Sequence, residues 1–177
     1  MLAVGSRYES ARSGGSIQIV ERTPESMSFE RTYAPDTGRA DPHYHLDFVQ
    51  TWEAVRGTGA IEVDGDRRDF AAGDRVRLEL GTPHRDPFNP GEAEFVVRGT
   101  FEPSTDFIEA YAEAWAHHLR EGTVNDQDEM PLMQILAIAR ATGGESYRAG
   151  VPRALQRATL PLVAAIARLR GFRTAYD

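Results

Sequence analysis

The chain has 177 residues, of which 41% are hydrophobic and 27% are charged, and its formal net charge is −7 at pH 7. This length predicts one domain, at most with an appendage, and the composition is typical of a folded globular protein. An acidic chain without a basic run is a poor candidate for binding nucleic acid or an anionic membrane.

Two residue types are missing from the sequence. It contains no cysteine, which excludes disulfides, thiolate nucleophiles and thiolate metal sites. It contains no lysine, because all twenty basic residues are arginine, and this excludes Schiff-base chemistry and a P-loop lysine. A transition-metal site would therefore use the five histidines and oxygen ligands. Since no window approaches 18 apolar residues and no signal-peptide pattern is present, we expect a cytoplasmic protein without a membrane span.

The first part of the chain indicates short strands. Residues 1–15 are small and polar, and we expect a flexible N-terminal tail there. From 16 to 102, apolar and polar residues alternate between turn signals such as Asp64-Gly65, which favours a tight hairpin. This pattern predicts a mainly β protein, built as a small antiparallel β-barrel or jelly roll. The expected strands are 16–21, 26–33, 48–56, 59–63, 67–70, 75–80 and 93–101.

The period changes after Phe101, and residues 103–177 indicate a helical extension. The spacing of Asp106 and Glu109 resembles a capping box, and Gly122 lies where the first helix should end. A second helix is expected from Pro131 to Gly143, and a third from 152 to 170, kinked or split by Pro161. The apolar stripes of these helices should pack on the barrel or form a dimer interface.

Three histidines lie in the β half. His43 and His45 are two residues apart on an extended segment, so both rings point to the same face. Gln50 follows on the next expected strand, and His84 comes just after the strand 75–80. If the sheet closes into a small barrel, the four side chains meet inside it, and three imidazoles with one amide oxygen suit Fe, Mn, Ni, Co or Zn.

This stretch resembles the cupin family. The family's first motif has His-x-His, three or four residues, a glutamate, six residues and a glycine. Here His43-Tyr44-His45 is followed by four residues, Gln50, six residues and Gly57. The second motif, which begins with a glycine and continues with Pro-x-Gly and a histidine, is similar to the stretch from Gly73 to His84. Together the two motifs cover roughly residues 27–101.

The sequence departs from the family pattern at four positions. Glutamine stands at 50 where glutamate is usual, Glu79 replaces the proline, Asn89 comes one residue late, and Gly38 is one residue too close to His43. The resemblance implies a divalent transition metal bound by His43, His45, Gln50 and His84, and a homodimer. It also implies one of the cupin reactions, which include dioxygenation, decarboxylation and isomerisation.

Gln50 changes the expected charge of the site. Three imidazoles and an amide carry no charge, so a bound ion would keep its +2 and favour an anionic, chelating substrate. The alternative is that Gln50 marks a site that has lost its metal. Two further side chains are candidates for the substrate pocket: Trp52, which shares the face of Gln50, and Arg31, an anion clamp if it points inward. On an edge strand Arg31 would instead face solvent.

Three functions are compatible with these residues. The first is a metal-dependent enzyme acting on a small anionic or chelating substrate. The second is a small-molecule-binding or sensing cupin with a weak or absent metal site. The third is an assembly role in which the helices from 131 to 170 form a dimer interface.

Overall fold

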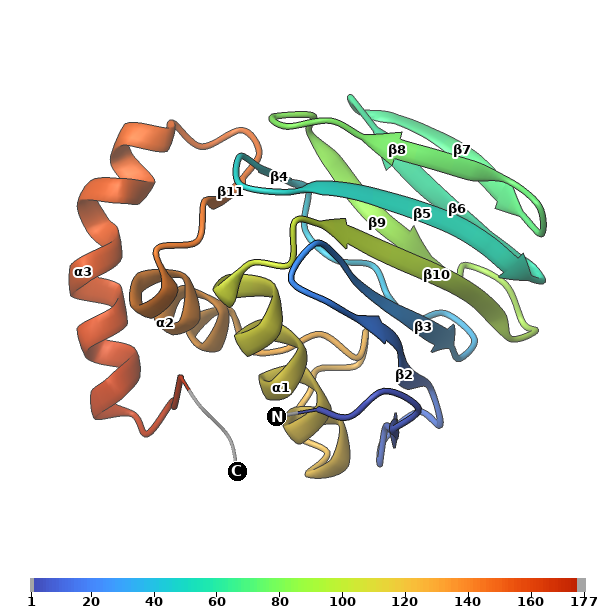
Figure 1. Cartoon of the computed structure of the whole chain (residues 1–177), viewed down its shortest axis with the longest axis horizontal. Coiled ribbons are helices and arrows are strands. Elements are labelled where there is room, and N and C mark those ends of the chain that lie inside the picture. Colours follow the sequence, from blue (N-terminus) through green and yellow to red (C-terminus); the bar gives the residue numbers. More distant parts are fainter. Residues whose placement is uncertain (1, 175–177) are drawn as a thin grey trace.

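The computed structural model describes residues 2–174. In this range the strands precede the helices, apart from one short strand between the second and third helix (Figure 1). The elements are β1 (Arg7–Glu9), β2 (Ser16–Arg22), β3 (Met27–Tyr33), β4 (His43–His45), β5 (Val49–Arg56), β6 (Thr58–Val63), β7 (Asp66–Ala71), β8 (Arg75–Leu78), β9 (His84–Phe88), β10 (Phe95–Glu102), α1 (Asp106–Arg120), α2 (Leu132–Thr142), β11 (Ser146–Arg148) and α3 (Arg153–Leu169).

The strands form two antiparallel sheets. One sheet has the order β1-β2-β3-β10-β5-β8, and the other has the order β11-β4-β9-β6-β7. The alternating residues of each sheet that point inward form a shared core, which includes Phe29, Trp52, Ile61, Phe95 and Val97. The predicted mainly β, jelly-roll-like fold followed by helices is therefore confirmed.

The helices lie beside the β-sandwich rather than around it (Figure 1). Trp115 of α1 packs edge-on against Phe29 of β3, with 5.6 Å between the ring centroids, so α1 continues the core of the sandwich. α2 packs between α1 and α3. The short strand β11 then pairs with β4, with Tyr147 opposite Tyr44, so the extension adds a strand to the second sheet.

Some local features differ from the sequence-based expectations. Within residues 1–15, β1 pairs with β2, and Ser10 donates a hydrogen bond of 2.7 Å to the buried Asp128. The segment from 84 to 88, which was not among the expected strands, is β9. α3 passes through Pro161 without splitting, so of the expected kink or split the split is wrong. Proline has no backbone N–H, so the carbonyl of Arg157, four residues earlier, lacks its helical hydrogen bond. Both residues are exposed, so water can bond to this carbonyl instead.

No helix among residues 2–174 is long and apolar enough to cross a membrane.

Candidate metal centre

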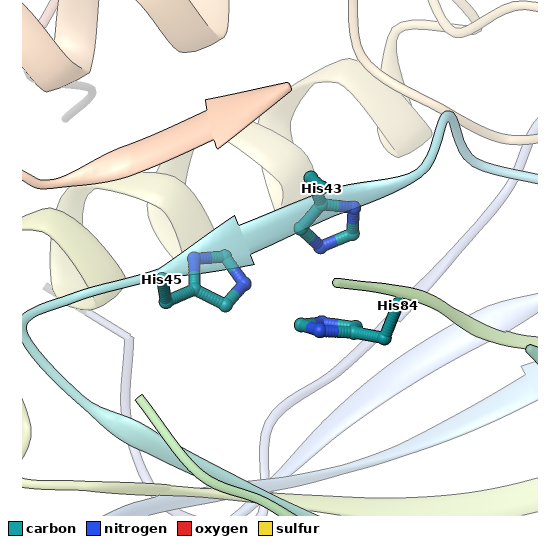
Figure 2. A group of neighbouring side chains, drawn as sticks. All are labelled: His43, His45 and His84. Atoms are coloured by element: carbon teal, nitrogen blue, oxygen red, sulfur yellow. The ribbon is translucent and has the colours of Figure 1, made fainter. Parts of the chain in front are cut away.

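The two sheets bring His43, His45 and His84 together. His43 and His45 occupy the ends of the three-residue strand β4 and so point to one face. His84 begins β9 and lies opposite His43 in the register of the antiparallel pair. One ligand atom from each ring lies within 4.8 Å of the others, and Figure 2 shows the three rings around one space. A single ion of the size of a first-row transition metal can be reached by all three.

Backbone carbonyls set the tautomers of two of these rings. His43 Nδ1 lies 2.8 Å from the carbonyl oxygen of Asp41, and His84 Nδ1 lies 2.8 Å from that of Thr82. Because a carbonyl only accepts, each Nδ1 carries the proton and donates it. The Nε2 atom of each ring therefore keeps its lone pair, as in histidines that bind metal. Within the described residues, His84 Nε2 is buried and makes no hydrogen bond.

Burial keeps two of the imidazoles neutral. The pKa of His45 is well below its ordinary value, mainly because the ring is removed from water and secondarily because of His43 and His84. Burial also lowers the pKa of His84, with His43 adding to the effect. A neutral imidazole can donate its lone pair to a metal ion, whereas an imidazolium cannot. These shifts leave both rings ready to bind a cation at neutral pH.

Gln50 is buried on β5 with its amide held in one orientation. Its Nε2 donates a hydrogen bond of 3.1 Å to Asp86 Oδ1. The reverse orientation would place two acceptor oxygens together without a proton between them, so Asp86 selects the one observed. Gln50 Oε1 is buried and has no hydrogen-bond donor in the described part of the chain. It is an orphaned oxygen of the kind that a metal ion would satisfy.

Asp86 was missed by the sequence analysis. Its carboxylate accepts a hydrogen bond of 3.2 Å from Trp52 Nε1, and its oxygens lie 3.6 Å from His84 Nε2 and 3.8 Å from His43 Nε2. One residue, Arg85, separates His84 from Asp86, so on a strand the two side chains share a face. Because 84–88 was not among the expected strands, this spacing was not recognised. Asp86 also corrects the expected neutral ligand environment, because it brings a negative charge next to the histidines.

A cavity of about 650 Å³ opens beside the histidines. Its wall includes His43, His45, Gln50 and Asp86, and also the two pocket candidates from the sequence, Trp52 and Arg31. Trp52 is almost completely buried. The cavity thus joins the candidate ligands to a space large enough for a small organic molecule.

Arg31 points inward, but its charge is already paired. Its Nη2 lies 3.1 Å from Glu129 Oε1, and its guanidinium carbon lies 4.1 Å and 4.3 Å from the ring centroids of Tyr33 and Trp115. Both members of the ion pair are buried. The expectation of an anion clamp is therefore weakened, since the guanidinium already donates a hydrogen bond to Glu129 within the protein.

The helical extension supplies the outer wall of the cavity. Tyr111 and Trp115 come from α1, Met130 from the loop after it, Ile135 from α2, and Tyr147 from β11. The sequence alone left the extension as core, lid or dimer interface. In the structure, much of it faces the same space as the histidines.

Comparisons with known proteins give structural similarity without a close relative. No protein-family model matches the chain, and no curated protein matches it. KdgF from Halomonas sp. is similar at 24% identity and a TM-score of 0.49, over 56% of this chain and 87% of that one.

Two further solved structures are similar over the same share of the chain. A sugar phosphate isomerase of the cupin superfamily from Silicibacter pomeroyi has 13% identity and a TM-score of 0.47, with 56% and 71% of the two chains covered. An RmlC-like cupin from Shewanella frigidimarina has 20% identity and a TM-score of 0.45, with 55% and 83% covered. With two antiparallel sheets and three converging imidazoles, the β part of this chain is a cupin-like β-sandwich.

Proposed function

We propose that this chain is a metal-dependent enzyme of the cupin type. In this proposal, His43, His45 and His84 bind a divalent transition metal, and Gln50 contributes its amide oxygen. The observation that carries the proposal is the convergence of three imidazoles beside a cavity, with the Nε2 of His84 buried and unpaired among the described residues. Such a lone pair costs free energy unless a partner satisfies it.

A bound metal ion would act as a Lewis acid on an oxygen atom of the substrate. Asp86 faces the cavity and is held by Trp52 and Gln50, so it is placed to accept a proton from a substrate lying there. Trp52 forms part of the wall and also fixes the carboxylate. The substrate class that these residues support is a small oxygenated organic molecule that chelates the ion through its oxygens.

The donor set does not select one metal. Imidazole nitrogen with an amide oxygen suits Fe, Mn, Ni, Co and Zn alike. Iron would support oxygen-dependent reactions, whereas zinc or nickel would support isomerisation or lyase chemistry without redox change.

A second candidate is a small-molecule-binding or sensing cupin without metal. The cavity wall is mainly apolar, which favours ligand binding even when no ion is present. Replacement of the family's usual glutamate by Gln50 removes one negative ligand and also favours this reading.

Elemental analysis tests the choice between the two. The protein would be purified without chelator and without a nickel column, and the same preparation would be made for His45→Ala and His84→Ala. His117→Ala is the matched control, because His117 lies on α1 outside the cluster. We expect about one equivalent of transition metal in the wild type and the control, and loss of it in the other two variants. Wild-type protein that takes up no metal from an excess of Zn²⁺, Fe²⁺, Mn²⁺, Co²⁺ or Ni²⁺ would overturn the enzyme proposal.

We also propose that the chain forms a homodimer through α3. Leu155, Leu162 and Leu169 are spaced seven residues apart and thus lie along one side of this helix. Their exposed fractions are 54%, 66% and 89%, which is unusual for leucine on one stripe. Pairing with a second copy would remove this stripe from water.

A further inference from the structure

The cavity wall away from the metal centre is dominated by apolar and aromatic side chains. Phe29 and Phe101 come from the β-sandwich, Phe107 and Trp115 from α1, and Met130 and Ile135 from the segment that follows. Phe29 stacks on Phe101 with 5.2 Å between the centroids. Faces and edges of aromatic rings therefore meet the space from two sides, an arrangement that suits another aromatic ring.

The arginines in this wall are each paired with an acidic residue of the protein. Arg31 is paired with Glu129 at 3.1 Å, Arg148 with Asp41 at 3.2 Å, and Arg39 with Asp36 at 3.4 Å. The Arg31 pair is buried, whereas the Arg148 and Arg39 pairs are exposed to solvent and therefore weaker. Binding a carboxylate or phosphate through one of these arginines would require breaking a pair, and for Arg31 that would leave buried Glu129 uncompensated.

A polyhydroxylated ligand would also find few partners in this cavity. Every sugar hydroxyl that leaves water needs a hydrogen bond, and an unsatisfied one costs about 1–3 kcal/mol. Asp86 and Gln50 are polar, but they already bond to each other beside the histidines. Thr123, Asn125 and Gln156 also line the cavity, but each is already hydrogen-bonded within the protein. Most of the exposed wall is apolar and rewards burial of apolar surface.

We infer that the ligand of this cavity is a largely apolar, aromatic molecule of one to three rings that carries oxygen donors at one end only. The rings lie between the sandwich and α1 and α2, and the oxygens face the histidines. The volume of about 650 Å³ is within the range of pockets that enclose drug-sized ligands. The inferred orientation of the ligand's oxygens rests on the proposed metal site. The inference that the ligand is mainly apolar and aromatic rests only on the residues that line the cavity.

The two tryptophans of the chain make this inference directly measurable. Trp52 and Trp115 are the only tryptophans in the sequence, and both line the cavity. Their emission therefore reports on its contents. Metal-free, chelator-treated protein would be titrated with 2-naphthol and with glucuronate, with tryptophan fluorescence and calorimetry as the two readouts. We expect saturable binding of 2-naphthol that is at least about tenfold tighter than that of glucuronate.

Matched variants locate the binding. Ile135→Glu places a charge in the wall, and Ala141→Glu places the same charge on the exposed side of the same helix α2. Naphthol binding should weaken at least about tenfold in the first variant and stay unchanged in the second. If Ile135→Glu does not fold, Met130→Gln provides a milder polar change in the same wall, and weaker naphthol binding is again expected.

The outcomes separate this inference from the proposed function. Naphthol binding that fails in metal-free protein, or that Ile135→Glu and Met130→Gln leave unchanged, would overturn the inference. Tighter binding of glucuronate than of naphthol would overturn it as well, even if the protein holds metal. Naphthol binding in a protein that takes up no metal would support the aromatic ligand and reject the metal-dependent reaction. Loading with Zn²⁺ should further tighten the binding of 2,3-dihydroxynaphthalene but not of 2-naphthol, because only the former can chelate.

Discussion

Replacement of Asp86 by asparagine should weaken metal binding while leaving the fold intact. The carboxylate lies 3.6 Å and 3.8 Å from the Nε2 atoms of His84 and His43, so its charge acts on any cation held by these rings. It also accepts hydrogen bonds from Gln50 and Trp52. Asparagine keeps one oxygen that can accept both bonds but removes the charge.

The charge of Asp86 determines the expected change in metal affinity, and its hydrogen bonds determine the expected change in stability. Loss of a group that supports metal ligands typically lowers metal affinity about 10–100-fold, which corresponds to about 1.4–2.7 kcal/mol. Because Asp86→Asn retains the acceptor for Gln50 and Trp52, its stability should change by less than about 1 kcal/mol. Asp86→Ala removes both hydrogen bonds and leaves two buried donors unsatisfied. Its stability should fall by about 2–4 kcal/mol, in addition to the loss of affinity.

Competition for Zn²⁺ with a coloured chelator measures the affinity, and urea unfolding of the metal-free proteins measures the stability. Asp69→Asn is the matched control, because Asp69 is exposed on β7, away from the histidines, and loses the same charge. An Asp86→Asn protein that is folded and binds Zn²⁺ within about twofold of the wild type would refute the assigned role. So would an equal loss of affinity in the Asp69 control, since the effect would then come from net charge.

Three further predictions concern the buried ion pair and the extension. Burial raises the pKa of Glu129 above its ordinary value of 4.5 despite Arg31, so the folded protein holds this proton more tightly than the unfolded chain. Its contribution to the free energy of unfolding is complete below pH 4.5 and is lost as pH rises through the higher pKa of the folded state. Urea unfolding at several pH values should show that Glu129→Gln removes this pH dependence of the free energy of unfolding. Leu162→Glu should convert a dimer into a monomer in light scattering, and an unchanged mass would exclude α3 as the interface. A chain that stops after Glu102 should aggregate, because α1 no longer covers Phe29 and Phe101, and a soluble folded product would show that the barrel does not need the extension.

The barrel and its histidines were predictable because their signals are local. Strand alternation places His43 and His45 on one face whatever surrounds them, and the turns at Asp64-Gly65 and Gly73 bring later strands back to the sheet. The long strand β10 was also expected, although its pairing with both β3 and β5 was not. Pairing partners depend on contacts between distant segments, which periodicity does not encode.

Asp86 was not predictable in the same way. His84 and Asp86 share a face only if 84–88 forms a strand, and the sequence does not indicate one. Pro87 and Asn89 disfavour a strand there. The partner of Arg31 was equally hidden. Glu129 lies 98 residues further along the chain, between α1 and α2, and only the fold of the extension brings it to the guanidinium.

The pairing of β11 with β4 brings the two parts of the chain to the wall of one cavity. Arg148 lies opposite His43 and Ser146 opposite His45, so the strand that carries two candidate ligands is bordered by the extension. The residues that resemble cupins, roughly 27–101, contain the candidate ligands, whereas much of the cavity wall comes from α1, α2 and β11. Under the proposed function, metal binding and ligand choice therefore depend on different segments. A chain with the same histidines and a different extension would keep the metal ligands but change the cavity wall. The ligand therefore has to be inferred from α1, α2 and β11 and not from the barrel motifs.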